Sequence, residues 1–269
     1  MTTTRPSSSV VVGIDGSAAA MAVALWAVDE AVDRDVPLRL VHVVPAANSD
    51  DSFAWETEHA HTSLRAADAA VRATGKPVKV ETALVRGGTR AALLRESRAA
   101  AMMCVGSVGA GQVDDESLGS TAATLANTAH CPVAIIATHR QTPPTNPGCI
   151  VAAVDDPVDN HAVVEHSFAE AALRGAPLKA LGLRSPHHDQ TRDEGLDHRL
   201  EVWRDRYPGV PVHHATAPDG VAEFVAASQQ PIQLAVIGRT DAGQILRLVD
   251  PVGASVFDHT ECSILVIRD

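Results

Sequence analysis

The chain of 269 residues consists of one sequence pattern that occurs twice. Four segments of the first half recur in the same order in the second half. The matched segments are VVVGID at 10–15 with IVAAVD at 150–155, DVPL at 35–38 with GAPL at 175–178, MMCVG at 102–106 with LAVIG at 234–238, and CPVAII at 131–136 with CSILVI at 262–267. Because the order of segments is kept, we expect two copies of a single folding unit.

Short apolar runs alternate with longer helical stretches along each copy. In the first copy the expected strands are 10–14, 38–44, 78–85, 102–106 and 133–137, and the expected helices are 17–34, 51–74, 89–99 and 121–129. The apolar side of the first helix is expected to carry Met21, Leu25, Trp26, Val28 and Val32. Apolar strands alternating with helices are typical of a parallel sheet that is covered on both faces. We therefore predict an α/β protein with two tandem, doubly wound domains.

The boundary between the two copies is marked by a change in composition. The stretch QTPPTNPG at 141–148 holds three prolines and a glycine, which is typical of a linker. We predict a first domain over 1–141, a linker over 142–148 and a second domain over 149–269.

The glycines that follow the fourth strand of the first copy have a spacing that favours phosphate binding. Gly106, Gly109 and Gly119 form a G-x2-G-x9-G pattern, and Ser120 and Thr121 follow directly at the start of a helix. Glycine lets the backbone approach a ligand closely, and backbone N–H groups form an anion nest that the helix N-terminus reinforces. The pattern is not a P-loop, because no Lys follows the last glycine, and its third glycine comes too late for a dinucleotide fingerprint.

Charge and composition exclude several classes of function. Residues 1–141 hold 12 basic and 15 acidic side chains and residues 142–269 hold 10 and 18, which together give a formal net charge of −11. Nonspecific nucleic-acid binding requires clustered Lys and Arg, so we expect no nucleic-acid partner. No apolar run reaches the ~18 residues of a membrane span, and MTTTRPSSS lacks the apolar core of a secretion signal. We expect a cytoplasmic protein without a membrane partner.

Cysteines and histidines show no pattern of a metal or catalytic site. Cys104, Cys131, Cys149 and Cys262 form no C-x-x-C pair, and we expect them to be buried small side chains. The 13 histidines include no H-x3-H or H-E-x-x-H spacing. No G-x-S-x-G nucleophile elbow occurs either. We predict no catalytic residues and no metal ligands.

Three motifs in this order resemble the universal stress protein family. They are G-x-D-G-S at 13–17, the glycine loop with its serine at 106–120, and C-P-V-x-I-I at 131–136. The tandem arrangement is similar to that of the two-domain bacterial members, and the resemblance covers nearly the whole chain. It implies the adenine nucleotide alpha hydrolase-like fold, with a five-stranded parallel sheet in each domain. Many members of the family bind ATP, and others do not.

The resemblance also implies a nucleotide site at the carboxyl ends of the strands. Asp15 and Val41 would lie at the adenosine end, and the helix start at Gly119 would hold the phosphates. The residues implied for the whole site are Asp15, Gly16, Ser17, Val41, Val105, Gly106, Gly109, Gly119, Ser120 and Thr121. Taken alone, Asp15 is also explained as a turn residue and Ser120 as a helix cap.

Two departures from the family pattern bear on affinity. The glycine loop contains no Lys or Arg but holds Asp114, Asp115 and Glu116, which would repel a triphosphate unless they face solvent or hold Mg²⁺. In the second copy, Asp241 and Ala254 occupy the positions of Gly109 and Ser120, and the sequence DDP at 155–157 replaces DGS at 15–17. We expect this second domain to be degenerate and to serve as a structural partner of the first.

These observations predict a cytoplasmic stress-response regulatory protein whose first domain binds ATP or a related adenine nucleotide, with Mg²⁺ as the accompanying ion. A regulatory protein partner and a homodimer are both in keeping with the resemblance. The alternative is an interaction module of the same fold that uses no nucleotide. A third hypothesis is an enzyme such as a nucleotidyl transferase or a phosphatase. It is disfavoured because no Lys or Arg clamp for a transferring phosphoryl group is present in the loop. We expect slow ATP hydrolysis at most.

Overall fold

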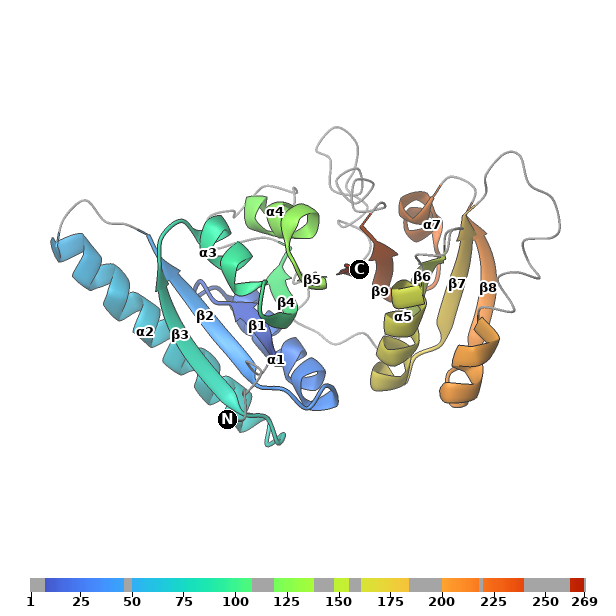
Figure 1. Ribbon diagram of the computed structural model, residues 1–269, viewed down its shortest axis with the longest axis horizontal. Helices are drawn as coiled ribbons and strands as arrows, with labels where there is room; N and C mark the ends of the chain where they lie inside the picture. Colours follow the sequence, from blue (N-terminus) through green and yellow to red (C-terminus); the bar gives the residue numbers. More distant parts are fainter. Residues whose placement is uncertain are drawn as a thin grey trace, which may run out of the picture. The chain divides into compact units, whose positions relative to one another are not determined.

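The computed structural model describes residues 8–45, 50–107, 119–137, 148–154, 161–183, 200–217, 220–239 and 262–268 (Figure 1). The chain divides into two compact units, Met1–Thr138 and His139–Asp269. Apart from Gly148, the predicted linker lies outside the described residues.

The first unit is a parallel sheet whose helices alternate with its strands. Its elements are β1 (Ser9–Gly13), α1 (Ala18–Asp33), β2 (Leu38–Val44), α2 (Asp50–Ala73), β3 (Val80–Arg86), α3 (Thr89–Glu96), β4 (Ala100–Gly106), α4 (Ser120–Thr128) and β5 (Val133–Ile136). The strand order is β3-β2-β1-β4-β5, and all of these pairings are parallel. The doubly wound α/β fold predicted from the alternation is confirmed.

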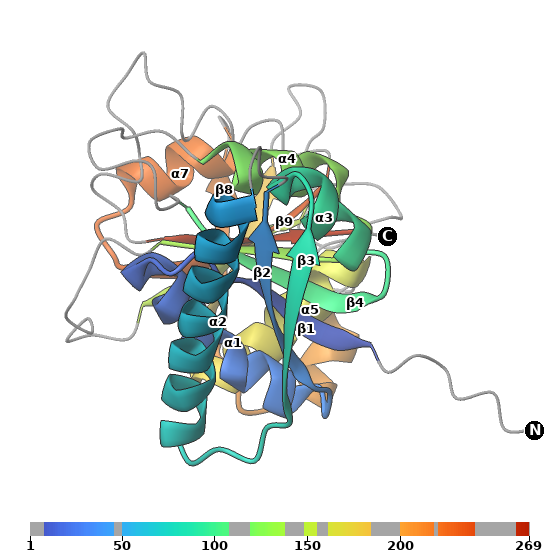
Figure 2. The same cartoon turned by 90° about the vertical axis from the view of Figure 1, so that its left-hand side faces the viewer.

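Two pairs of helices cover the two faces of this sheet. Helix α1 packs against α2, and α3 packs against α4 (Figure 1). Helix α2 lies along β2 and β3, as the turned view shows (Figure 2). With a helix layer on each side, β1 is buried along nearly its whole length, and Val10, Val11 and Val12 are at most 1% exposed. This explains why the strand is a continuous apolar run and does not alternate.

The buried face of α1 differs from the one predicted. Leu25 and Val32, expected on the apolar side, are 40% and 36% exposed. The buried residues of the helix are Ala20, Val23, Ala24, Ala27, Val28, Glu30 and Ala31. Small alanine side chains let the helix axis approach the sheet closely. The prediction, which followed the large apolar side chains, therefore did not identify the alanine-rich face of α1 that is buried.

The second unit repeats the plan of the first. Its elements are β6 (Cys149–Val154), α5 (His161–Arg174), β7 (Leu178–Leu183), β8 (Val212–Ala217), α7 (Val221–Ala227), β9 (Ile232–Gly238) and β10 (Ser263–Ile267), and residues 200–206 are also helical. The strand order is β10-β9-β6-β7-β8 with parallel pairing. Five strands were expected in this unit, but the positions of β8 and α7 were not located in the sequence. The reason is that β8 reads VHHATA, with too few apolar residues to indicate a buried strand.

All four cysteines are free thiols in buried positions, as predicted. Burial raises the pKa of the Cys262 thiol to about 12 and also raises the pKa of Cys149. A buried thiol that stays protonated is a poor nucleophile and a poor metal ligand. These residues therefore act as small core side chains.

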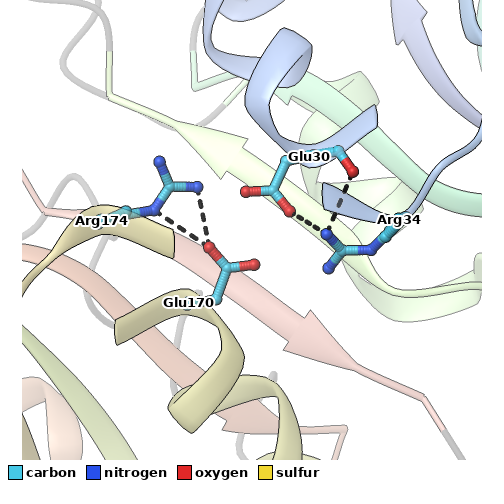
Figure 3. Close-up of polar contacts among 4 residues, drawn as sticks. All are labelled: Glu30, Arg34, Glu170 and Arg174. Carbon is cyan, nitrogen blue, oxygen red and sulfur yellow. Dashed lines mark hydrogen bonds and ion pairs between the residues drawn. The ribbon is translucent and has the colours of Figure 1, made fainter. Parts of the chain in front are cut away.

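Each unit contains its own buried ion pair, and the two pairs occupy matching positions of the repeat (Figure 3). On α1, Arg34 Nη1 donates to a Glu30 carboxylate oxygen at 2.5 Å, and the Glu30 side chain is 0% exposed. On α5, Arg174 donates from Nε at 3.1 Å and from Nη2 at 2.8 Å to Glu170 Oε2, and the Glu170 side chain is 1% exposed. Each Glu–Arg pair is spaced i,i+4, and each Arg precedes a repeat of the P-L dipeptide that opens the next strand. The internal repeat therefore extends to polar core residues as well as to the apolar pattern.

Candidate functional site

A cavity of about 400 Å³ opens at the carboxyl ends of β1, β2 and β4 in the first unit. It is lined by Gly13, Ile14, Asp15, Ser17, Ala20, Val41, His42, Val43, Thr89, Leu93, Val105, Gly106, Gly119, Ser120, Thr121 and Ala122. The cavity lies where the chain leaves β1 toward β2 on one side and where β4 pairs with β1 on the other. Open parallel sheets bind ligands at this switch in strand order, and the volume is within the range of small-molecule sites.

Eight of the ten residues predicted for the site line this cavity. They are Asp15, Ser17, Val41, Val105, Gly106, Gly119, Ser120 and Thr121. Gly16 lies between two lining residues, in the turn that links β1 to α1. Gly109 lies outside the described residues, as do the acidic loop residues Asp114, Asp115 and Glu116. The fold thus brings together residues that are more than 100 positions apart in the sequence.

The turn between β1 and α1 is held by its own side chains. Asp15 Oδ1 accepts hydrogen bonds from the Ser17 backbone N–H at 3.0 Å and from Ser17 Oγ at 2.6 Å. Ser17 Oγ in turn accepts from the backbone N–H of Ala20 at 3.1 Å, which caps α1. The carboxylate of Asp15 therefore has a clear structural role in the turn, and the same residue also lines the cavity.

The turn also depends on glycine at position 16. Gly16 has φ +86°, a conformation that side-chain-bearing residues rarely adopt. A Cβ placed on it would lie 2.8 Å from Ser63 Oγ and 3.2 Å from His59 Nε2, both on α2. Helix α2 therefore contacts the turn directly, which the sequence did not indicate.

Val41 forms part of the cavity wall at the end of β2. It is 1% exposed, it pairs with Gly13 in the sheet, and its carbonyl accepts a hydrogen bond from the Ile14 backbone N–H at 2.8 Å. These contacts fix the direction in which the chain leaves β1. As a result, Ile14 and Asp15 line the same cavity as Val41.

Helix α4 points its N-terminus at the cavity. Its N-cap is Gly119, no side chain of the described residues caps it, and Ser120, Thr121 and Ala122 all line the cavity. The Gly119 N–H donates to the Ser107 carbonyl at 2.8 Å, which anchors the start of the helix to the end of β4. A nine-residue helix without a side-chain cap offers N–H donors and a positive dipole end to an anion.

The described part of the cavity wall carries little charge. Among its lining residues, Asp15 and His42 have ionisable side chains, and none is a Lys or Arg. A cluster of three His, Cys, Asp or Glu side chains able to hold a metal ion does not occur within the described ranges. An anion bound here would therefore depend on backbone N–H groups and hydroxyls for its contacts.

Eight lining residues were not predicted from the sequence, and three of them are Thr89, Leu93 and His42. Thr89 and Leu93 come from the first turns of α3, whose predicted helix gave no sign of facing a ligand. His42 is 6% exposed, and within the part of the chain that the structure describes its buried Nδ1 has no hydrogen-bond partner. Burial lowers the pKa of His42, and the nearby imidazole of His59 lowers it further. The one available signal was an imidazole inside the otherwise apolar run LVHVV at 40–44.

The first unit is a doubly wound α/β domain with a cavity at the carboxyl edge of its parallel sheet. The model of the universal stress protein family matches residues 7–137. Universal stress protein Rv2624c of Mycobacterium tuberculosis is 47% identical over 261 residues, which cover 97% of this chain and 96% of that protein. Universal stress protein Rv3134c of the same organism is 41% identical, covering 100% and 98%. The chain belongs to the universal stress protein family.

A solved structure supports the fold over both units. A universal stress protein from Archaeoglobus fulgidus matches 97% of this chain and 96% of its own with a TM-score of 0.71 and 15% identity. The likeness confirms the adenine nucleotide alpha hydrolase-like fold that the motifs implied. Among the described residues, no helix combines the length and the hydropathy needed to cross a bilayer.

Proposed function

We propose that the first unit binds an adenine nucleotide, ATP or a close relative, and that occupancy of this site regulates contact with a protein partner in a stress response. The adenosine end would lie at Asp15 and Val41, and the phosphates would lie at the N-terminus of α4. The observation that carries the proposal is the single cavity wall that joins the β1–α1 turn to Gly119, Ser120 and Thr121.

The uncapped start of α4 supports the assignment of the phosphate end. Ser120 and Thr121 add hydroxyl donors to the N–H groups of the first helical turn, and each neutral donor adds a modest contribution. The described wall has no cation to stabilise a transferring phosphoryl group. A binding and signalling role is therefore favoured over rapid catalysis, with slow hydrolysis at most.

The experiment has two steps. Mass spectrometry of small molecules released from the purified, denatured full chain identifies any nucleotide that copurifies. Calorimetric titration with ATP, ADP and AMP, with and without Mg²⁺, then measures affinity and stoichiometry. The proposal expects an adenine nucleotide in the first step and saturable binding in the second.

Matched variants locate the site. Thr121→Val removes a hydroxyl from the cavity wall and is expected to weaken ATP binding about fivefold, the effect of losing one hydrogen bond of about 1 kcal/mol. Thr128→Val changes the same residue type at the other end of α4, where its hydroxyl bonds the Thr124 carbonyl, and should leave affinity unchanged. If no adenine nucleotide binds the wild-type chain, the nucleotide-independent interaction module becomes the better hypothesis.

A further inference from the structure

His42 lies in the cavity wall and also packs against helix α2. The residue is 6% exposed, and its Nδ1 has no hydrogen-bond partner among the described residues. Its ring meets the ring of His59 edge-on, with centroids 6.1 Å apart and an interplanar angle of 81°. Buried polar atoms are nearly always hydrogen-bonded, so an unpartnered nitrogen at a binding site requires a functional explanation.

The same part of α2 contacts the β1–α1 turn. The atoms nearest to a Cβ built on Gly16 are Ser63 Oγ, at 2.8 Å, and His59 Nε2, at 3.2 Å. Ser63 is fixed by its hydrogen bond to the His59 carbonyl at 3.0 Å. The His59 ring stacks on Trp55, with centroids 5.5 Å apart and planes within 6°. One imidazole of α2 therefore faces both His42 and the turn that carries Asp15.

The charged groups that act on His42 come from the turn and from α2. Burial lowers its pKa most, and His59 lowers it further, while the carboxylates of Asp15 and Glu56 act in the opposite direction without outweighing burial. The ring is therefore neutral at pH 7. A proton added in acid would place a charge inside the wall, and a cation at that depth is unfavourable unless it is paired or hydrated.

We propose that His42 and His59 are positioning residues that keep α2 against the Asp15–Ser17 turn while His42 is neutral, so that acidification releases the turn and weakens ligand binding. The inference rests on the proposed function, because it describes how the same site is regulated. Movement of α2 away from the turn would increase the hydration of protonated His42. Helix movement then removes the contacts that His59 and Ser63 make with Gly16.

The test measures ATP affinity of the full chain by calorimetry from about pH 8 to about pH 5, the range in which imidazoles titrate. Wild-type affinity is expected to be flat above pH 6.5 and to fall below it by up to about tenfold per pH unit, the limit for one linked proton. His42→Leu removes the titrating group, and its affinity should change less with pH than that of the wild type. The ratio of the two affinities at each pH cancels the titration of ATP itself. His42→Gln provides a second uncharged variant if the leucine variant fails to fold.

Two variants of α2 form a matched pair. His59→Gln removes the imidazole that opposes a charge on His42, so the loss of affinity should begin at higher pH. His61→Gln changes an exposed histidine two positions further along the helix and should reproduce the wild-type profile. An identical pH profile in wild type and His42→Leu would overturn the proposal.

A readout without ligand separates this inference from the proposed function. In a ¹⁵N NMR titration of the ligand-free chain, the His42 imidazole and the Gly16 amide should shift with one shared midpoint. A Gly16 amide that stays fixed while His42 titrates would refute the coupling. Absence of ATP binding at about pH 8 would refute the proposed function alone, and the NMR titration would still decide whether α2 and the turn respond to the proton.

Discussion

Replacing Gly16 by alanine should destabilise the first unit and weaken its ligand site. The alanine must adopt φ +86°, a left-handed conformation that costs a residue with a Cβ about 1–2 kcal/mol. It must also approach Ser63 Oγ to 2.8 Å, while Ser63 is 8% exposed and hydrogen-bonded to His59. Overpacking of a buried contact costs about 1–3 kcal/mol. We therefore expect Gly16→Ala to lower the free energy of unfolding by about 2–5 kcal/mol, the sum of the two effects.

Gly75→Ala is the matched control, because Gly75 has φ +68° and open space where its Cβ would lie. It should show the backbone effect alone, about 1–2 kcal/mol in urea unfolding of the full chain. Adding Ser63→Ala to Gly16→Ala should recover part of the difference, since the alanine removes the oxygen that the new Cβ meets. Equal destabilisation by Gly16→Ala and Gly75→Ala would refute the close contact between the turn and α2. ATP titration of the same variants should show a loss for Gly16→Ala only.

Further predictions concern charge, stoichiometry and pH. Arg34→Met leaves the buried carboxylate of Glu30 without this ion pair and should destabilise the chain by about 3–5 kcal/mol in urea unfolding, towards the lower end because Arg34 is 18% exposed. Calorimetry should give at most one nucleotide per chain; two equivalent sites would contradict the degenerate second copy. Because the folded pKa of His42 lies below 6.5, the unfolded chain binds the proton first as pH falls. Stability should therefore decline below pH 6.5, by at most about 1.4 kcal/mol per pH unit, and less so in His42→Leu. The triple variant Asp114→Asn, Asp115→Asn, Glu116→Gln removes the negative charge of the glycine loop. It should strengthen ATP binding in EDTA by up to about 1 kcal/mol per charge. If the variant instead loses binding of Mg-ATP, these carboxylates are metal ligands.

The sequence by itself determined the fold class, the repeat and half of the residues in the cavity wall. A continuous apolar strand such as 10–14 is typical of a parallel sheet with helices on each side. In such a sheet, the ends of β1 and β4 are neighbours. The turn at Asp15 and the glycines at 106 and 119 therefore had to meet at one edge, however far apart they lie in the sequence.

Tertiary packing alone decided which side chains complete and support the site. The helical periodicity and the size of the side chains predicted that Leu25 and Val32 lie on the apolar side of α1. In the folded protein the alanines of α1 are buried instead. The contact of α2 with Gly16 and the burial of His42 arise between segments that are separate in the sequence, so no local pattern encodes them. Spacing along the chain specifies which strand end a residue occupies. The burial of an imidazole depends on which other parts of the fold pack against it, and its pKa depends on that burial.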